Sequence, residues 1–124
     1  MDLDRLREER VIRLTTYRRD STPVGTPMNI AFDDNGHAYF RTSEDAAKVA
    51  RLRRNADVEV AASTWRGTPT GPSSSATARR LEGAEAEQAR RALVAKYRVM
   101  HGIIVPLRAR LTGHAGVYYE LTER

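Results

Sequence analysis

The stretch VIRLTTYRRDSTPVGTPMNIAFDDNGHAYFRT, residues 11–42, decides the fold class because it reads as three β-strands joined by short turns. β-branched and aromatic residues dominate residues 10–17, a composition typical of a strand. The turn sequence RRDSTPVG leads into a second strand, predicted at about residues 24–32. The DDNG sequence after it predicts a hairpin turn, since Asn35 and Gly36 tolerate the positive φ of tight turns. The third strand, residues 37–42, is therefore predicted to run antiparallel to the second.

Beyond the third strand the pattern changes to helix and then back to strand. Ser43 is predicted to cap a helix over about residues 44–54, because the acidic residues after it complement the positive end of a helix. The remaining strands are predicted at residues 58–65, 76–83 and 115–122, with a Gly-, Pro- and Ser-rich loop at 66–75.

A second helix is predicted at residues 84–97, with residues four apart on one face at Ala89, Leu93 and Tyr97. Residues 98–113 carry conflicting signals, because a Gly and a Pro interrupt any helix there. The expected fold class is α+β and mainly β: a small six-stranded antiparallel barrel with helical insertions, in a single domain of residues 1–124.

Composition limits the partners and the compartment. The net charge of +5 favours anionic partners, such as phosphates, carboxylates, nucleic acid or an acidic membrane surface. Aromatic residues make up only 6% and fall mostly in strands, so a base-stacking nucleic-acid surface is not expected. No window approaches the roughly 20 apolar residues of a membrane span. The sequence begins without the apolar core of a signal peptide and has no Cys, so a cytoplasmic location and no membrane partner are expected.

One group of residues suggests an anion site. Arg41 and Thr42 end a predicted strand, Ser43 begins a helix, and Lys48 and Arg51 lie three apart on the face of that helix. Together they could hold a phosphate near the helix N-terminus. The alternative is that the helix presents a solvated basic face beside its negative end. No metal site is predicted, and no nucleophile elbow, Walker loop or dinucleotide fingerprint is present, so an enzyme of this sequence would depend on a cofactor.

Three stretches of the sequence resemble the pyridoxamine-phosphate-oxidase-like split β-barrel superfamily: VIRLTTYRRDSTPVGTPMNIAFDDNGHAYFRT, KVARLRRNADVEVA and TARRLEGAEAEQARRALVAKY. The resemblance is to its actinobacterial branch of coenzyme F420 (deazaflavin) dependent oxidoreductases. It implies an FMN-binding-protein-like split barrel that forms a homodimer, with two cofactor sites at the subunit interface and a small-molecule substrate.

The resemblance also implies roles for particular residues. Arg41, Thr42 and Lys48 are expected to bind the cofactor phosphate, with Ser43 and Arg51 as further contacts. The tricyclic ring would be lined by the second strand, through Thr26, Pro27, Met28 and Asn29. A role at an edge strand suits Pro27, because proline removes one donor from the sheet ladder.

Two positions depart from the pattern of these relatives. An aromatic residue is usual near Asn29, and a bulky group is usual in the loop that here reads Ser73, Ser74 and Ser75. Smaller side chains at both places would reshape the pocket, which leaves open a larger substrate or a loss of catalysis.

The leading hypothesis is a reductase that transfers a hydride from reduced F420 to a small electron-poor organic substrate. The alternatives are an FMN-dependent oxidoreductase of the same fold, a non-catalytic F420 carrier and a nucleic-acid binder. No catalytic side chain is assigned.

Overall fold

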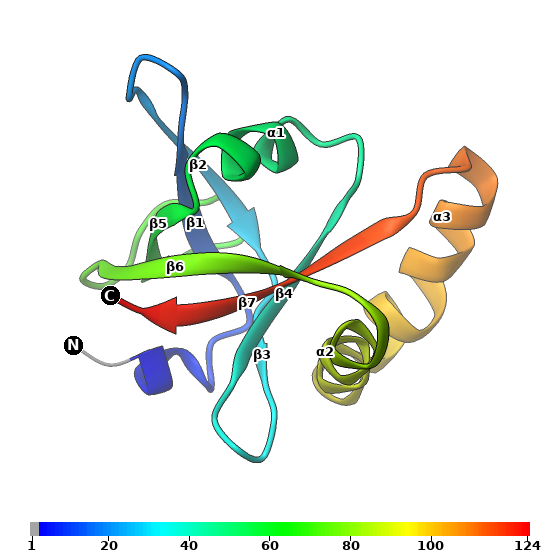
Figure 1. Cartoon of the computed structure of the whole chain (residues 1–124). Coiled ribbons are helices and arrows are strands. Elements are labelled where there is room, and N and C mark those ends of the chain that lie inside the picture. Colours follow the sequence, from blue (N-terminus) through cyan, green and yellow to red (C-terminus); the bar gives the residue numbers. More distant parts are fainter. Residues whose placement is uncertain (1–2) are drawn as a thin grey trace.

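The computed structural model describes residues 3–124, and its centre is one antiparallel sheet that curls on itself (Figure 1). The strands are β1 (Ile12–Tyr17), β2 (Pro23–Met28), β3 (Ala31–Phe32), β4 (Ala38–Ser43), β5 (Asp57–Ala62), β6 (Ser74–Leu81) and β7 (Gly116–Glu123). The helical elements are the 3-10 turn η1 (Leu3–Leu6), α1 (Ala47–Arg54), α2 (Gly83–Lys96), the π-helical turn η2 (Met100–Ile104) and α3 (Val105–Thr112). The expected α+β class is confirmed.

The sheet order is β2-β1-β5-β6-β7-β4-β3, so the two edge strands are consecutive in the chain. The strand predicted at 24–32 breaks at Asn29 and Ile30, because β2 pairs with β1 whereas β3 pairs with β4. This break makes seven strands out of the predicted six. The chain thereby passes from one edge of the sheet to the other, which curls the sheet around a common interior.

The end of α2 satisfies the backbone groups that the break removes from the ladder. The amide of Ile30 donates to the Tyr97 hydroxyl at 3.3 Å, and the Ile30 carbonyl accepts from that hydroxyl at 3.0 Å. The ammonium of Lys96 donates to the same carbonyl at 2.8 Å. Buried backbone groups without partners destabilise a fold, so these two side chains stabilise the change of strand partner.

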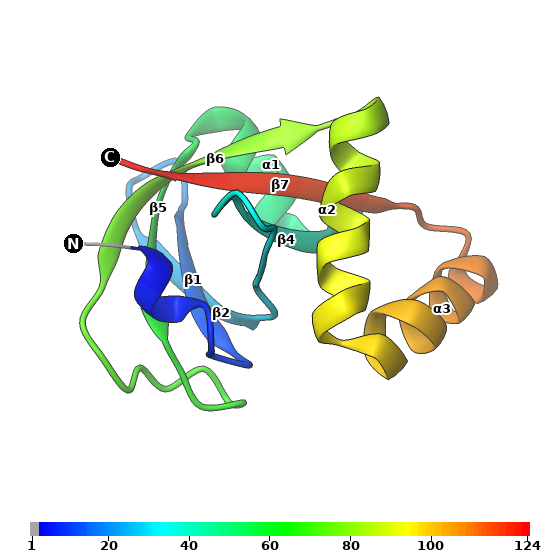
Figure 2. The same cartoon turned by 90° about the horizontal axis from the view of Figure 1, so that it is seen from below.

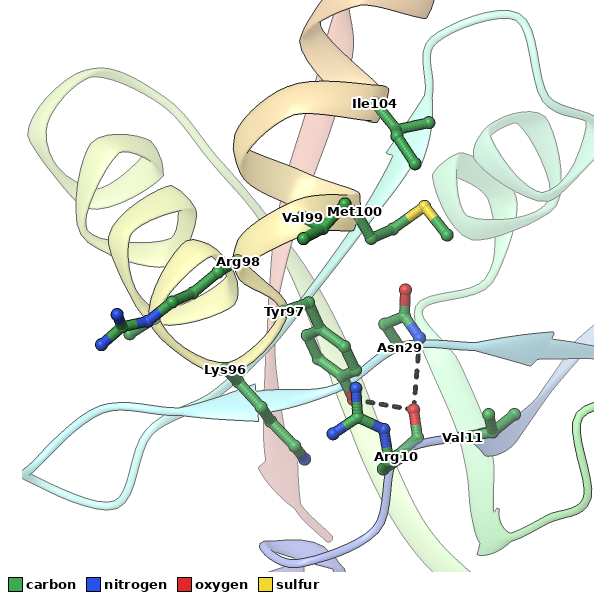
Figure 3. Close-up of a pocket in the computed structure, with 10 residues that line it drawn as sticks. Arg10, Val11, Asn29, Lys96, Tyr97, Arg98, Val99, Met100 and Ile104 are labelled. Atoms are coloured by element: carbon green, nitrogen blue, oxygen red, sulfur yellow. Dashed lines mark hydrogen bonds between the residues drawn. The ribbon is translucent and has the colours of Figure 1, made fainter.

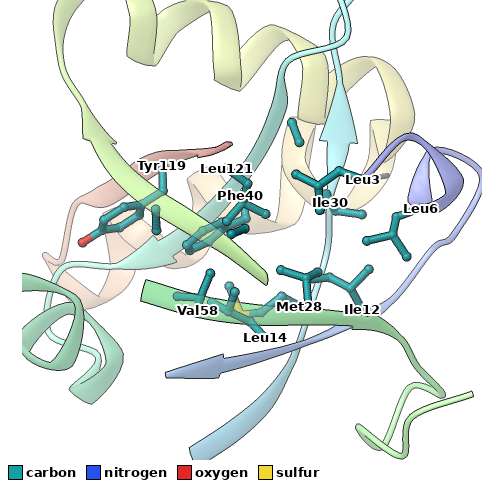
Figure 4. Packing of buried hydrophobic residues seen from close by; sticks show 14 of the residues in the cluster. Leu3, Leu6, Ile12, Leu14, Met28, Ile30, Phe40, Val58, Tyr119 and Leu121 are labelled. Carbon is teal, nitrogen blue, oxygen red and sulfur yellow. The ribbon is translucent and has the colours of Figure 1, made fainter. Parts of the chain in front are cut away.

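The core fills the interior of the curled sheet (Figure 4). Alternate residues of β1, Ile12 and Leu14, are fully buried, as the period of two requires. Phe40 of β4 stacks on Tyr119 of β7 with 5.0 Å between ring centroids. Helix α1 adds Leu52 to the same cluster and so closes one end of the interior.

Helix α2 covers the outer face of the sheet beside β4 and β7 (Figure 2). Ala89, Leu93 and Tyr97, predicted to share one face, are all buried there. Helix α3 follows and projects to the edge of the molecule, away from both termini (Figures 1 and 2), and none of its residues is buried. No helix within residues 3–124 is long and apolar enough to cross a membrane.

The predicted hairpin between β3 and β4 is present, and an aspartate organises it. The backbone amides of Asn35 and His37 donate to Asp33 Oδ1 at 2.9 and 3.0 Å. Only Gly36 of the turn has positive φ (84°), so the prediction that Asn35 shares this conformation is wrong. Burial alone would raise the pKa of Asp33, but hydrogen bonds, first from His37 and then from Tyr39, outweigh it and hold the pKa at about 2.

Two local predictions are wrong because sheet pairing extends further than expected. Ser43 does not cap a helix: it is the last residue of β4 and pairs with Gly116, while α1 begins at Ala47 without a side-chain cap. Ser74 and Ser75 belong to β6 and not to the preceding loop. The hydroxyl of Ser74 is buried and accepts a hydrogen bond from Arg5 at 2.9 Å, which lets a serine occupy an inward position.

Candidate functional site

The nine residues predicted to bind a cofactor divide between two faces of the sheet and helix α1. Strand alternation places Thr26, Met28 and Thr42 on the inner face, with Met28 and Thr42 buried. The same alternation places Pro27, Asn29, Arg41 and Ser43 toward the outside, and Lys48 and Arg51 extend from α1. The predicted set therefore forms three neighbouring groups, and not one cradle.

The first group is a set of cations around α1: Arg18, Lys48, Arg51 and Arg54, called here the α1 cation cluster. Arg51 Nε donates to the hydroxyl of Thr16, a buried residue of β1, at 2.7 Å, which fixes the guanidinium against the sheet. Burial lowers the pKa of Arg51, and the charges of Arg18 and Arg54 lower it further. Like charges thus surround this guanidinium.

Lys48 is half-buried in the same cluster. Burial lowers the pKa of its ammonium, and the positive charge of Arg51 adds to the effect. No carboxylate within residues 3–124 forms a salt bridge with a member of the cluster. Arg18 and Arg54 are exposed, and Asp20 lies within electrostatic range of Arg18, but Lys48 and Arg51 are half-buried. Half-buried cations are unfavourable unless an anion accompanies them, so this part of the cluster fits a phosphate.

The second group is Arg41 and Ser43, which line a cavity of about 320 Å³ between the end of β4 and helix α3. A Cβ atom on Gly116 would lie 2.2 Å from Arg41 Nε, so glycine is required for the guanidinium to lie across β7. Arg108 and His114 line the same cavity, and His114 Nε2 lies 3.5 Å from Asp45. The cavity is basic with one acidic group.

The third group centres on Asn29, which borders a groove of about 560 Å³ (Figure 3). Its side-chain amide donates to the carbonyl of Arg10 at 3.2 Å, and the Tyr97 hydroxyl donates to that carbonyl at 2.8 Å. Met100 and Ile104 form an apolar side of the groove. A small apolar groove with a few fixed polar groups is the usual form of a small-molecule site.

Sequence reasoning assigned no role to His101, which the structure shows to be buried. Burial lowers the pKa of His101, and the charge of Arg41 lowers it further, so the imidazole is neutral near pH 7. Its Nε2 lies 3.1 Å from Asn29 Oδ1, an acceptor, so Nε2 carries the proton. A signal was present, because the four-residue spacing of Leu93 and Tyr97 continues to His101.

The curled sheet, closed by α1 and covered by α2, defines a split β-barrel protein. The chain belongs to the pyridoxamine 5'-phosphate oxidase family, because residues 3–117 match the sequence profile of that family. The family-level resemblance expected from the sequence is therefore confirmed. No curated protein sequence matches the chain significantly.

Solved structures support the same fold. The haem storage protein HutZ from Vibrio cholerae matches with a TM-score of 0.71 and 13% identity, over 94% of this chain and 83% of HutZ. The conserved protein Rv2991 from Mycobacterium tuberculosis matches with a TM-score of 0.67 and 20% identity, over 98% and 77%. The Agrobacterium tumefaciens protein Atu2129, of unknown function, matches with a TM-score of 0.70 and 18% identity, over 93% of this chain and 48% of Atu2129. This chain thus spans about half the length of Atu2129.

Proposed function

We propose that this protein is an F420H2-dependent reductase, which transfers a hydride from the deazaflavin to a small electron-poor organic substrate. The α1 cation cluster is the observation that carries the proposal. Lys48 is half-buried beside Arg51, burial lowers its pKa, and no acidic side chain among residues 3–124 forms a salt bridge with it. A bound phosphate would supply the missing negative charge and strong acceptor oxygens.

Thr42 and the cations of α1 suit the phosphate. Lys48 and Arg51 would supply the charge, and Thr42 ends the inner face of the strand that leads to α1. Arg41 and Ser43 were expected at the phosphate as well. Because they face the cavity beside α3, we assign them to a more distant anionic part of the cofactor.

The strand residues suit the ring. β2 pairs on one side only, so its outer backbone groups are available to the polar edge of a tricyclic ring. Pro27 and Asn29 share the outward side of this strand, while Thr26 and Met28 support it from within. The hydrogen bonds of Asn29 hold its amide in one orientation beside the groove.

The reduced deazaflavin supplies the hydride when bound. The chain therefore needs only to bind the cofactor, to orient the substrate and to exclude water. Neutral His101 keeps the Asn29 amide fixed, and Met100 and Ile104 keep one side of the groove apolar. We further propose the homodimer, with a second copy completing the substrate pocket. Asn29 is smaller than the aromatic residue usual near this position, which would reshape the pocket. The alternative that the experiment must distinguish is therefore a non-catalytic F420 carrier.

A second candidate is an FMN-dependent oxidoreductase, favoured by membership of the pyridoxamine 5'-phosphate oxidase family. FMN shares with F420 a tricyclic ring and a phosphate, so the same groups would hold it. The likeness to HutZ, a haem storage protein, adds haem as a third ligand to examine.

The test is a titration of the purified protein with F420, FMN and haemin under one salt concentration. Saturable micromolar binding of F420 with much weaker FMN binding is expected, followed by turnover with activated enones or quinones. Tight binding of FMN alone would establish the second candidate. F420 binding without turnover of any acceptor would indicate a carrier. If none of the three ligands binds, the proposal is overturned.

A further inference from the structure

The η2–α3 segment exposes a row of large apolar side chains. Val99, Ile103, Leu107 and Leu111 are spaced four residues apart and are 63, 62, 54 and 79% exposed. Residues at this spacing lie on one side of a helix, so the four form a continuous strip, called here the apolar row. At 1.5 Å per residue the row is about 18 Å long.

The charged residues within the segment that carries the apolar row are all basic. From residue 98 to residue 116 the sequence contains Arg98, Arg108 and Arg110, together with two histidines, and no Asp or Glu. Arg98 and Arg110 form no salt bridge with any residue in the described part of the chain. Asp45 faces both His114 and the charge of Arg108 at the smaller cavity, and Glu44 accepts a hydrogen bond from the Ala115 amide, so the positive charge beside the apolar row rests on Arg98 and Arg110. The complementary surface is therefore anionic.

We propose that the η2–α3 segment docks on an anionic lipid surface, with the apolar row in the interface and the arginines at the headgroups. An apolar strip flanked by basic residues is the pattern of helices that lie in a membrane interface. Helix α3 projects from the edge of the molecule in two perpendicular views (Figures 1 and 2). A projecting strip can enter a fluid interface without a matching groove. This proposal is independent of the proposed reductase activity, and it revises the expectation of no membrane partner.

A second copy of the chain is a poorer occupant. In a twofold contact the same patch meets itself, which would bring the arginines of one copy near those of the other. A single row of four side chains is also narrow beside the roughly 800 Å² per partner of a stable protein interface. Hydropathy windows could not reveal the feature, because Arg and Gly residues interrupt the apolar positions.

The test is vesicle co-sedimentation of the full chain, with vesicles of phosphatidylcholine alone and of phosphatidylcholine mixed with phosphatidylserine. Binding to the anionic vesicles, weakened by added salt, is expected. The double variant Leu107→Gln/Leu111→Gln should lower the bound fraction by about tenfold or more, because it removes half of the apolar row. Both positions are exposed, so its thermal unfolding and its F420 affinity should stay unchanged.

Trp65→Gln is the matched control. Trp65 is 72% exposed on a distant loop, and the Arg66 guanidinium lies 4.8 Å from its ring. The substitution therefore removes an exposed apolar group beside a cation at a site away from the apolar row. Its vesicle binding should equal that of the wild type. Absence of binding to anionic vesicles, or equal binding by the double variant, would overturn the proposal. It would also be overturned if the double variant converted a dimer to a monomer, or if the row bound soluble polyglutamate but not vesicles.

Discussion

The two lysines of this chain should respond oppositely to the same substitution. Both are half-buried, and burial lowers the pKa of each. Lys96 donates to the carbonyls of Arg7, Glu9 and Ile30 at 3.0, 2.5 and 2.8 Å. Lys48 has the cation Arg51 as its neighbour and donates no hydrogen bond to any residue in the described part of the chain. Lys96 is therefore structural, and Lys48 is available to a ligand. Methionine keeps most of the apolar stem and removes the charge in both.

The magnitudes follow from these partners. Lys96→Met removes a hydrogen bond from three carbonyls, of which that of Ile30 keeps the Tyr97 hydroxyl, and it should lower the free energy of unfolding by about 2 to 4 kcal/mol. Lys48→Met removes a desolvated charge beside Arg51, so the free energy of unfolding should stay unchanged or rise. F420 affinity should fall by about 1.5 to 3 kcal/mol in Lys48→Met, which is roughly a 10- to 150-fold rise in Kd.

Urea unfolding of the unliganded proteins and fluorescence titration with F420 give the two readouts. For Lys96→Met only the free energy of unfolding in urea is compared, because its role is structural. Arg66→Met, on a distant loop, is the control for the loss of one positive charge. The reasoning is refuted if Lys48→Met destabilises the protein as much as Lys96→Met does. It is also refuted if Lys48→Met binds F420 like the wild type.

Three further substitutions test the fold around the groove. Asp33→Asn weakens the hairpin contacts and should lower the free energy of unfolding by about 2 kcal/mol in urea; because the folded pKa is about 2, wild-type stability should fall as pH drops from about 4 toward 2. Tyr97→Phe removes the hydroxyl that bonds to Ile30 and Arg10, and thermal unfolding should report a loss of about 1 to 2 kcal/mol. The folded pKa of His101 lies below its unfolded value of about 6.5. The free energy of unfolding should therefore be highest above about pH 6.5 and should fall as the pH drops below 6.5 and through the folded pKa. His101→Gln should flatten this pH dependence, and an unchanged curve in that variant would remove His101 as the cause.

Local signals were enough to predict much of the barrel. The alternation of β1, the turn before β2 and the glycine of the DDNG hairpin depend on neighbours within a few residues. The buried face of α2 follows from a four-residue period in the same way. These elements were predicted close to their observed bounds because short-range physics determines them.

The remaining features depend on contacts between residues distant in sequence. The break at Ile30 is stabilised by Tyr97 and Lys96, which lie more than sixty residues later in the chain. Ser43 looked like a helix cap, but pairing with Gly116 of the last strand extends β4 through it. No local pattern records such partners.

The candidate site shows the same division. The residue types and the spacing of Lys48 and Arg51 predicted a basic helix, and the structure contains one whose cations form no salt bridge with the described residues 3–124. The outward side of Arg41 follows from strand alternation, but the path of its guanidinium across Gly116 was not predictable, because it depends on the pairing of β4 with the last strand. Burial of His101 depends on the packing of η2 against the end of α2.

The most direct test of the account compares F420 with its phosphate-free deazaflavin riboside, each titrated into the wild type and Lys48→Met. The two ligands share the ring, so the ratio of their affinities isolates the tail that carries the phosphate. The wild type should prefer F420 by at least about tenfold, and Lys48→Met should lose most of that preference because its partner charge is gone. An undiminished preference in Lys48→Met would contradict the account, since the phosphate would then be held elsewhere.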